Sequence, residues 1–169
     1  LDSIELLIES MLKDNTEVAG VNWFKDENFG IFDKSSRYFP SFSEFTKTLL
    51  GDGYSTIINK ELGKCAKVVD WAAGSVLACK VSRYASLEGF DEGYFMYCED
   101  IDICYRSKLM HVPVIYYPHV KMRHLAEHAN RSVFSRHFFW HIKSVIRFLL
   151  TRQGLTTARS SLKCNVDNI

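Results

Sequence analysis

The sequence predicts an α/β fold, a mixed sheet with flanking helices. Segments with the apolar spacing of amphipathic helices alternate with short runs rich in β-branched and aromatic residues, and this alternation is typical of α/β proteins. The chain has 169 residues, of which 47% are apolar, which is enough for one domain with a hydrophobic core. Its first element is a helix, whereas such a domain normally starts with strands whose carboxyl ends carry the ligand site. We therefore expect the second half of an α/β domain.

The first predicted element is a helix over residues 1–13. Its apolar residues fall on one face: Ile4, Leu7, Ile8, Met11 and Leu12. Asp2 or Ser3 can cap its amino end, because a short polar side chain accepts from the free backbone N–H groups there. Residues 17–24 then predict a short strand.

The middle of the chain predicts shorter elements. The polar residues 25–37 indicate a loop or an irregular hairpin, and residues 40–51 fit a helix that begins after a proline and ends at a glycine. Residues 67–80 predict two strand pieces joined by a turn of small residues. Ser82 can cap a short helix that ends at Gly89.

The last third predicts a helix, a strand and a longer helix. A helix over residues 99–110 would turn four side chains inward: Ile101, Cys104, Tyr105 and Met110. Residues 112–118 are rich in β-forming residues, and the strand can continue past Pro118. Residues 133–150 form a long amphipathic pattern, followed by a polar tail.

Composition excludes several classes of protein. The net charge is +1, which gives no general case for nucleic-acid binding. No apolar run approaches the roughly 18 residues of a membrane span. The five cysteines are odd in number and form no CxxC pair, so they indicate reduced thiols in a cytosolic protein.

The segment from Gly89 to Arg106 crowds carboxylates among aromatic residues. It contains five acidic side chains beside five large apolar ones: Asp91, Glu92, Glu99, Asp100 and Asp102, with Phe90, Tyr94, Phe95, Met96 and Tyr97. Burying a charge is costly unless it is paired, hydrogen-bonded or bound to a metal. The segment is therefore either a solvated helix start beside a core, where negative charge is favoured, or a working site.

Several motifs occur here in one order: residues 69–75 (VDWAAGS), 89–92 (GFDE), 95–102 (FMYCEDID), 116–118 (YYP) and His124. Together they resemble the C-terminal half of inverting GT-A glycosyltransferases of family 2, most closely bacterial rhamnosyltransferases of lipopolysaccharide O-antigen and cell-wall biosynthesis. The resemblance covers roughly residues 1–150. It implies a partial GT-A (nucleotide-diphospho-sugar transferase) fold. The family's DxD motif and its nucleotide-binding N-terminal half are missing from this chain, so we expect a fragment.

The resemblance also implies catalytic residues. Inverting sugar transfer needs a base for the acceptor hydroxyl and a cation for the leaving nucleotide diphosphate. By resemblance Asp100 is the base, with Glu99 as the nearest alternative, and Asp102 supports the loop or the acceptor. A carboxylate beside aromatic walls suits a base, because desolvation raises its pKa.

Further site residues follow from the same motifs. By resemblance the substrate-binding residues are Asp70, Trp71, Gly74, Asp91 and Arg131. Trp71 can equally be a core residue beside a turn-forming Asp70, and Arg131 a solvated arginine. His124 lies where the family places a metal ligand, for Mn²⁺ or Mg²⁺ in the complete enzyme; the alternative is a surface histidine. Without the DxD aspartates we expect no tightly bound ion.

Two patterns near the C-terminus need separate interpretation. Residues 124–128 match H-x-x-E-H, an inverted zincin pattern, but the segment leaves a β-run and would need a further ligand. In the helix, Arg136, Lys143 and Arg147 form a basic stripe with Trp140 at its edge, which is typical of a membrane-surface helix. A helix packed on the core with a solvated basic edge is the alternative.

The sequence thus predicts the acceptor side of a glycosyltransferase domain (1–132), an amphipathic helix (133–152) and a polar tail (153–169). The expected reaction transfers a sugar from a nucleotide-sugar donor, dTDP-rhamnose by resemblance, to a lipid-linked saccharide acceptor. We expect a cytoplasmic protein, peripheral at the inner face of the plasma membrane, and self-association as a homo-oligomer through exposed apolar surface. The alternative is an interaction-only remnant of the fold that has lost donor binding.

Overall fold

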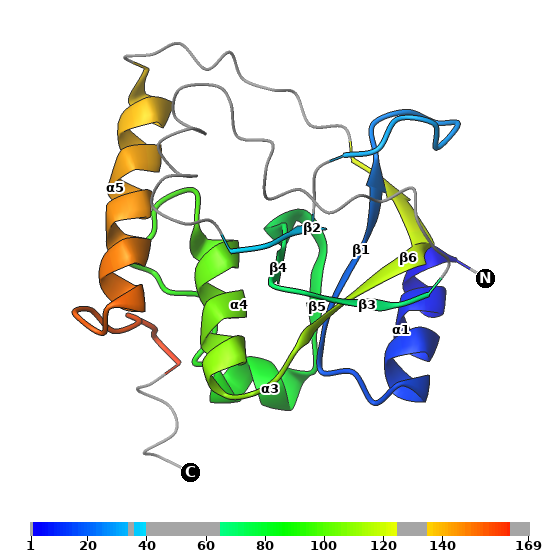
Figure 1. The fold of residues 1–169 in the computed structure, drawn as a ribbon, viewed down its shortest axis with the longest axis horizontal. Coiled ribbons are helices and arrows are strands. Elements are labelled where there is room, and N and C mark those ends of the chain that lie inside the picture. The colour runs from blue at the N-terminus through cyan, green and yellow to red at the C-terminus, as the bar shows by residue number, and fades with distance from the viewer. Residues whose placement is uncertain (1, 34–35, 40–64, 125–134, 163–169) are drawn as a thin grey trace.

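The computed structural model describes residues 2–33, 36–39, 65–124 and 135–162, and all structural statements below concern these residues. Its main sheet has four strands in the order β3-β6-β1-β5. The central strands β1 (Val18–Phe24) and β6 (Val114–Arg123) are parallel, while β3 (Lys67–Val69) and β5 (Leu77–Cys79) pair antiparallel at the edges (Figure 1). The sheet is therefore mixed, as the sequence predicts.

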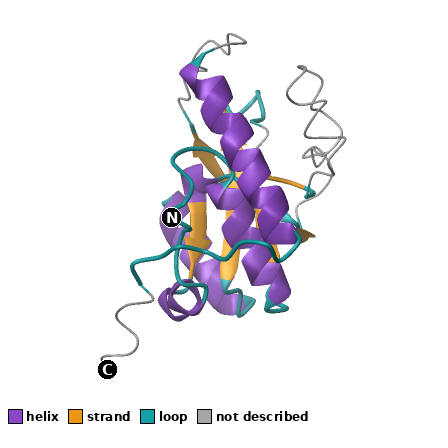
Figure 2. Ribbon diagram, turned by 90° about the vertical axis from the view of Figure 1, so that its left-hand side faces the viewer, coloured by secondary structure: helices purple, strands orange, loops and turns teal. Residues whose placement is uncertain are grey.

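Helices cover both faces of this sheet (Figures 1 and 2). Helix α1 (Ser3–Lys13) packs on one face, where Leu7 and Met11 meet Val21 of β1 in one apolar cluster. Helices α4 (Glu99–Leu109) and α5 (Arg136–Arg152) cover the other face, where a second cluster includes Tyr116 and Phe148. This arrangement confirms the predicted α/β class with flanking helices.

Strand β6 continues through Pro118, as predicted. Proline has no backbone N–H to donate to the ladder, and the register with β1 shifts between Val21 and Asn22 at this level. The Asn22 side-chain amide donates to the Pro118 carbonyl at 3.2 Å. The strand therefore reaches the end of the sheet, where His124 follows.

Helix α1 confirms its predicted cap but only part of its predicted face. Asp2 and Glu5 form a reciprocal capping box. Leu7 and Met11 are buried, but three aliphatic side chains on the same side remain more than half exposed: Ile4 (58%), Ile8 (52%) and Leu12 (70%). The sheet covers a narrower arc of the helix than its apolar pattern predicts.

Shorter elements complete the fold. Residues 24–33 form an irregular hairpin, with Phe24 opposite Phe32, as expected. Strands β2 (Ser36–Arg37) and β4 (Trp71–Ala72) make a second, two-stranded sheet, and a 3₁₀ turn spans Gly74–Val76. The helix predicted at 40–51 lies outside the described residues. No helix in the described part of the chain is long and apolar enough to cross a membrane.

Two local predictions are wrong. Ser82 does not cap helix α3 (Val81–Ser86), because Lys80 occupies the cap position without a side-chain hydrogen bond. Met110 does not point inward, since it is 46% exposed at the C-cap of α4. His111 follows in a left-handed conformation at φ 59°, and the Val112 N–H reaches back to the Ser107 carbonyl at 3.0 Å, as in a Schellman motif.

The predicted polar tail is docked as far as the structure describes it. The Arg159 N–H donates to Asp91 Oδ1 at 2.9 Å, and the Glu92 N–H donates to the Arg159 carbonyl at 2.7 Å. Ser161 donates to Glu92 through its N–H and its hydroxyl. Residues up to 162 therefore belong structurally to the loop that precedes α4.

Candidate active site

Glu99 and Asp100 form the first turn of α4, as predicted, at the end of the molecule where β1 and β6 finish (Figure 1). Tyr97 and Cys98 come directly before them in left-handed conformations, at φ 71° and 66°. Left-handed backbone costs on the order of 1–2 kcal/mol for a residue with a Cβ. Such strain persists only where the surrounding structure enforces it, and it gathers at functional sites.

Asp100 is held by backbone N–H groups from two elements. Its Oδ2 accepts from Gly74 at 3.0 Å, and its Oδ1 accepts from Ile101 at 2.8 Å. A Cβ on residue 74 would lie 3.3 Å from the Asp100 Cβ, so the missing side chain permits this close approach. The structure therefore brings together two residues that the sequence predicts for the site.

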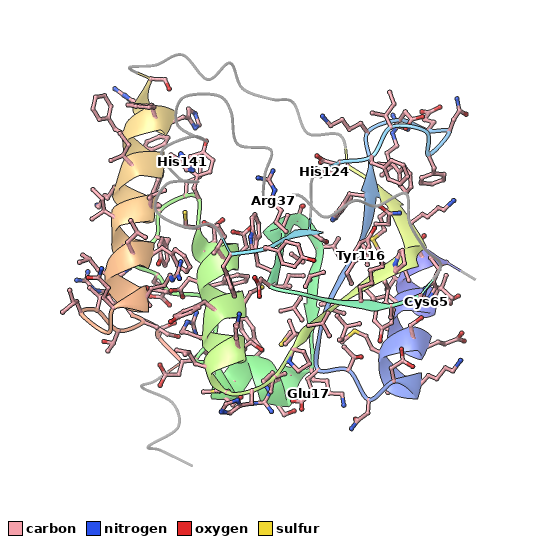
Figure 3. The ribbon with its side chains drawn as sticks, in the orientation of Figure 1. Glu17, Arg37, Cys65, Tyr116, His124 and His141 are labelled. Atoms are coloured by element: carbon pink, nitrogen blue, oxygen red, sulfur yellow. The ribbon has the colours of Figure 1, made fainter. Side chains whose placement is uncertain are left out.

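The environment of Asp100 suits a base. Burial raises the pKa of its carboxyl group, and the hydrogen bonds from Gly74 and Ile101 oppose that rise. The positive charge of Arg37 on β2 also lowers this pKa. Arg37 did not emerge from the sequence, because it belongs to no predicted motif; Figure 3 labels it at the same end of the molecule as His124.

The Glu99 carboxyl group has one oxygen that accepts no hydrogen bond from the described residues. Its Oε2 is buried and has no hydrogen-bond partner within the described residues. Burial raises the pKa of this carboxyl group, and the neighbouring charge of Asp100 raises it further. A buried carboxylate oxygen without a donor is costly, so a ligand hydroxyl that donates to it would be stabilised.

This environment gives a pH-dependent prediction for stability. Because the pKa of Glu99 is raised in the fold, the ionised form is penalised there, and the penalty disappears below its unfolded value of about 4.3. We expect Glu99→Gln to raise the thermal midpoint at pH 7.5 and to change it little near pH 4. Exposed Glu9→Gln is the control. A gain of equal size at both pH values would contradict the assignment.

Asp102 is not at the surface of the site. Its side chain is fully buried and accepts from Tyr94 Oη at 3.2 Å and from Arg106 Nε at 2.8 Å. Arg106 also donates to the carbonyls of Leu87 and Gly89. Asp102 therefore ties α4 to the loop before it, which agrees with its expected supporting role and not with a catalytic one.

Asp91 likewise faces inward, which corrects its predicted substrate-binding role. It is 1% exposed and pairs in bidentate geometry with Arg147 of α5, at 2.8 and 2.9 Å. Gly93 and Arg159 also donate their N–H groups to it. Both oxygens of the Asp91 carboxylate therefore accept hydrogen bonds from the protein itself and are not directed toward a substrate.

Asp70 and Trp71 hold neighbouring backbone in the described structure. Asp70 accepts from the Phe39 N–H at 2.9 Å and pairs with Lys108 at 3.0 Å. Trp71 is 9% exposed, and its Nε1–H donates to the Tyr38 carbonyl at 3.1 Å. This is the arrangement of the core alternative, in which the indole face is not free to stack on a sugar.

His124 directly follows β6, as predicted, and packs beside Trp23 with 5.0 Å between ring centroids. Its Nδ1 is buried and has no hydrogen bond to any residue that the structure describes; it lies 3.7 Å from Asp33 Oδ2, beyond hydrogen-bond distance. The described residues contain no group of three side chains arranged to hold a metal ion. His124 and Asp33 can therefore supply part of a coordination sphere only. Arg131 and the rest of the H-x-x-E-H pattern lie outside the described residues.

Comparison with known proteins identifies relatives that are named rhamnosyltransferases. The chain is 43% identical over 133 residues to a protein named rhamnosyltransferase WbbL from Escherichia coli K12, a match that covers 79% of this chain and 50% of that protein. It is 34% identical over 86 residues to the N-acetylglucosaminyl-diphospho-decaprenol L-rhamnosyltransferase of Mycobacterium tuberculosis, covering 51% of this chain and 28% of that protein. The chain thus spans half or less of the length of these relatives. No protein-family model and no solved structure matches it.

Proposed function

Because this chain is a homologue of bacterial rhamnosyltransferases, we propose that it forms the acceptor side of an inverting glycosyltransferase site with a GT-A-like fold. The donor is a nucleotide-sugar, with dTDP-rhamnose the first candidate, and the acceptor is a lipid-linked saccharide. The observation that carries the proposal is the pair Glu99–Asp100. Its two partly buried carboxyl groups, both with raised pKa, stand at a helix start held in strained backbone.

Asp100 has the features of the base in this proposal. The acceptor hydroxyl gives its proton to an Asp100 oxygen as it attacks the anomeric carbon, and the raised pKa strengthens that oxygen as a proton acceptor. The Gly74 and Ile101 N–H groups keep the carboxylate oriented throughout the reaction. Glu99 Oε2, which has no partner in the described structure, would accept from a second hydroxyl of the acceptor.

A divalent cation, Mn²⁺ or Mg²⁺, would take up the charge of the leaving diphosphate. His124 is the described residue suited to bind it, since its Nδ1 has no hydrogen-bond partner and the Asp33 carboxylate is close by. These side chains alone do not complete an octahedral site.

An assay of the intact gene product tests the reaction. Purified protein would be given a panel of nucleotide-sugars with a lipid-diphosphate-linked saccharide, and release of the nucleotide and growth of the acceptor would be followed. Coupled release and transfer from one donor supports the enzyme. Binding of the acceptor without turnover of any donor would favour the alternative, an interaction-only remnant of the fold.

A lipid-linked acceptor would keep the enzyme at a membrane surface, and the outer face of α5 suits that location. Phe139 (58%) and Ile146 (53%) are exposed there, and Phe95 of the adjoining loop is 72% exposed. Arg136 and Lys143 are exposed on the same face. The predicted basic stripe is wrong at Arg147, because that side chain is engaged with buried Asp91. We propose that this outer face docks at the inner surface of the membrane.

We expect the double variant Arg136→Gln/Lys143→Gln to bind anionic liposomes roughly 2 kcal/mol more weakly, at about 1 kcal/mol for each basic residue. Sedimentation with phosphatidylserine-containing vesicles measures this, and added salt should have a similar effect. Lys13→Gln/Lys121→Gln removes the same charge elsewhere and is the control. Equal binding by both double variants would leave the stripe as a solvated edge of a structural helix.

A further inference from the structure

The loop that leads into α4 is held by α5 at three residues in a row. The rings of Phe95 and Trp140 lie 4.8 Å apart between centroids. The Ser144 hydroxyl donates to the Met96 carbonyl at 2.7 Å. The Tyr97 hydroxyl lies 3.0 Å from His137 Nδ1, and its ring meets the His141 ring edge-on at 5.2 Å.

The α5 residues in these contacts share one face of the helix. They are spaced i, i+3, i+4 and i+7: His137, Trp140, His141 and Ser144. Figure 3 labels His141 on α5. This face differs from the outer face of Phe139, Lys143 and Ile146. One set of α5 residues therefore contacts the loop, and another set is exposed to solvent.

Ser144 shows that the contact is specific. A serine inside a helix commonly bonds the carbonyl four residues back or points to water. Ser144 is 4% exposed and instead donates across to the Met96 carbonyl. The carbonyl of the residue before the left-handed pair is thereby fixed in direction.

The turn at Met96–Cys98, which α5 contacts, contains strained backbone and therefore needs support from its surroundings. Tyr97 and Cys98 both carry a Cβ and both have positive φ, a combination that a free loop would relax. The Cys98 backbone sets where α4 begins, and therefore where Glu99 and Asp100 point. Just before Glu99 and Asp100, two groups are hydrogen-bonded to α5: the Tyr97 hydroxyl and the Met96 carbonyl.

We propose that Ser144 and His137 of α5 are positioning residues that fix the Met96–Cys98 turn and so set the direction of the Glu99 and Asp100 carboxylates. The functional meaning of that direction rests on the function proposed above, but the holding of the turn does not. Neither residue belongs to any motif by which the sequence resembles glycosyltransferases; tertiary packing alone brings them to the turn.

Single-oxygen deletions in the intact gene product test this. Ser144→Ala and Tyr97→Phe each remove one anchor and keep the surrounding packing. We expect each to lower kcat roughly tenfold with KM almost unchanged, because small displacements of reacting groups are costly. The acidic limb of the pH–rate profile should move to lower pH, since a loosened turn admits water to the carboxylates and reduces the desolvation that raises their pKa.

Ser86→Ala is the matched control, because it removes a hydroxyl that also bonds a backbone carbonyl, on α3; its kcat and pH profile should not change. A lower kcat for Ser144→Ala with an unmoved acidic limb would indicate general destabilisation and would overturn the positioning role.

Hydrogen exchange separates this inference from the proposed reaction. Peptides covering residues 95–103 should exchange faster in Ser144→Ala and Tyr97→Phe than in the unchanged protein, while peptides from β1 and β6 should not change. Unaltered exchange at 95–103 would refute the inference even in an active enzyme. If the variants exchange faster but the unchanged protein has no transferase activity, the inference that α5 anchors the turn is supported and the proposed function is rejected.

Discussion

An Asp100→Asn variant of the intact gene product should turn over roughly 10²–10⁴-fold more slowly than the unchanged protein, which is the usual contribution of a general base. Asparagine keeps the shape of the side chain and an oxygen for one of the two N–H groups that Asp100 holds. It cannot take up the acceptor proton. Acceptor binding should therefore change little, and the loss should appear in kcat.

Asp26→Asn is a matched control for this variant. Asp26 also accepts two backbone N–H groups, from Gly30 and Ile31, but lies in the exposed hairpin after β1. Its variant should keep normal turnover. Near-normal rates for Asp100→Asn would remove Asp100 as the base, and a large loss in Glu99→Gln alone would transfer the role to the neighbouring carboxylate.

An Arg147→Met variant should lose about 3–5 kcal/mol of unfolding free energy, because it leaves a buried charge without its partner. Asp91 is fully buried, and the Arg147 side chain is only 13% exposed. Methionine keeps an unbranched apolar side chain but lacks the guanidinium, which lies 5.4 Å from the centroid of the Tyr94 ring and against Gly93. Denaturant unfolding at pH 7 measures the loss.

Two further variants decide whether the charge is the cause. Lys143→Met, at an exposed position of the same helix, should change stability by less than about 0.5 kcal/mol. Adding Asp91→Asn to Arg147→Met should recover part of the loss, because the uncompensated charge disappears. A double variant as unstable as the sum of the two single variants would mean that packing, and not the ion pair, accounts for the effect.

The sequence predicted where the candidate site lies, but not which of its carboxylates are paired within the protein and which can meet a ligand. The ordered motifs around residues 99–102 placed the acidic pair at a helix start, and the structure confirms that position. They did not show that Glu99 Oε2 has no hydrogen-bond partner among the described residues, whereas Asp102 is paired with Arg106. Residues at positions 99, 100 and 102 look alike in a sequence, because exposure depends on which neighbours fold over them.

Local patterns determined most of the elements of this protein. The cap at Asp2, the strand predicted at 17–24 and the helix that starts at Glu99 each depend on residues within a few positions of one another. Helical spacing alone also predicted Arg147 on an outer basic stripe. That prediction failed because the loop at 91–94 and the docked residues after α5 cover the last turns of the helix.

The sequence by itself therefore determined the α/β class, the order of the elements and the acidic helix start. Only the tertiary structure decided which charges are buried and paired and which remain available to a ligand. The physical reason is distance along the chain. Asp91 meets Arg147 across 56 residues and Asp100 meets Gly74 across 26; no periodicity records such contacts, because they exist only when the sheet and helices pack together.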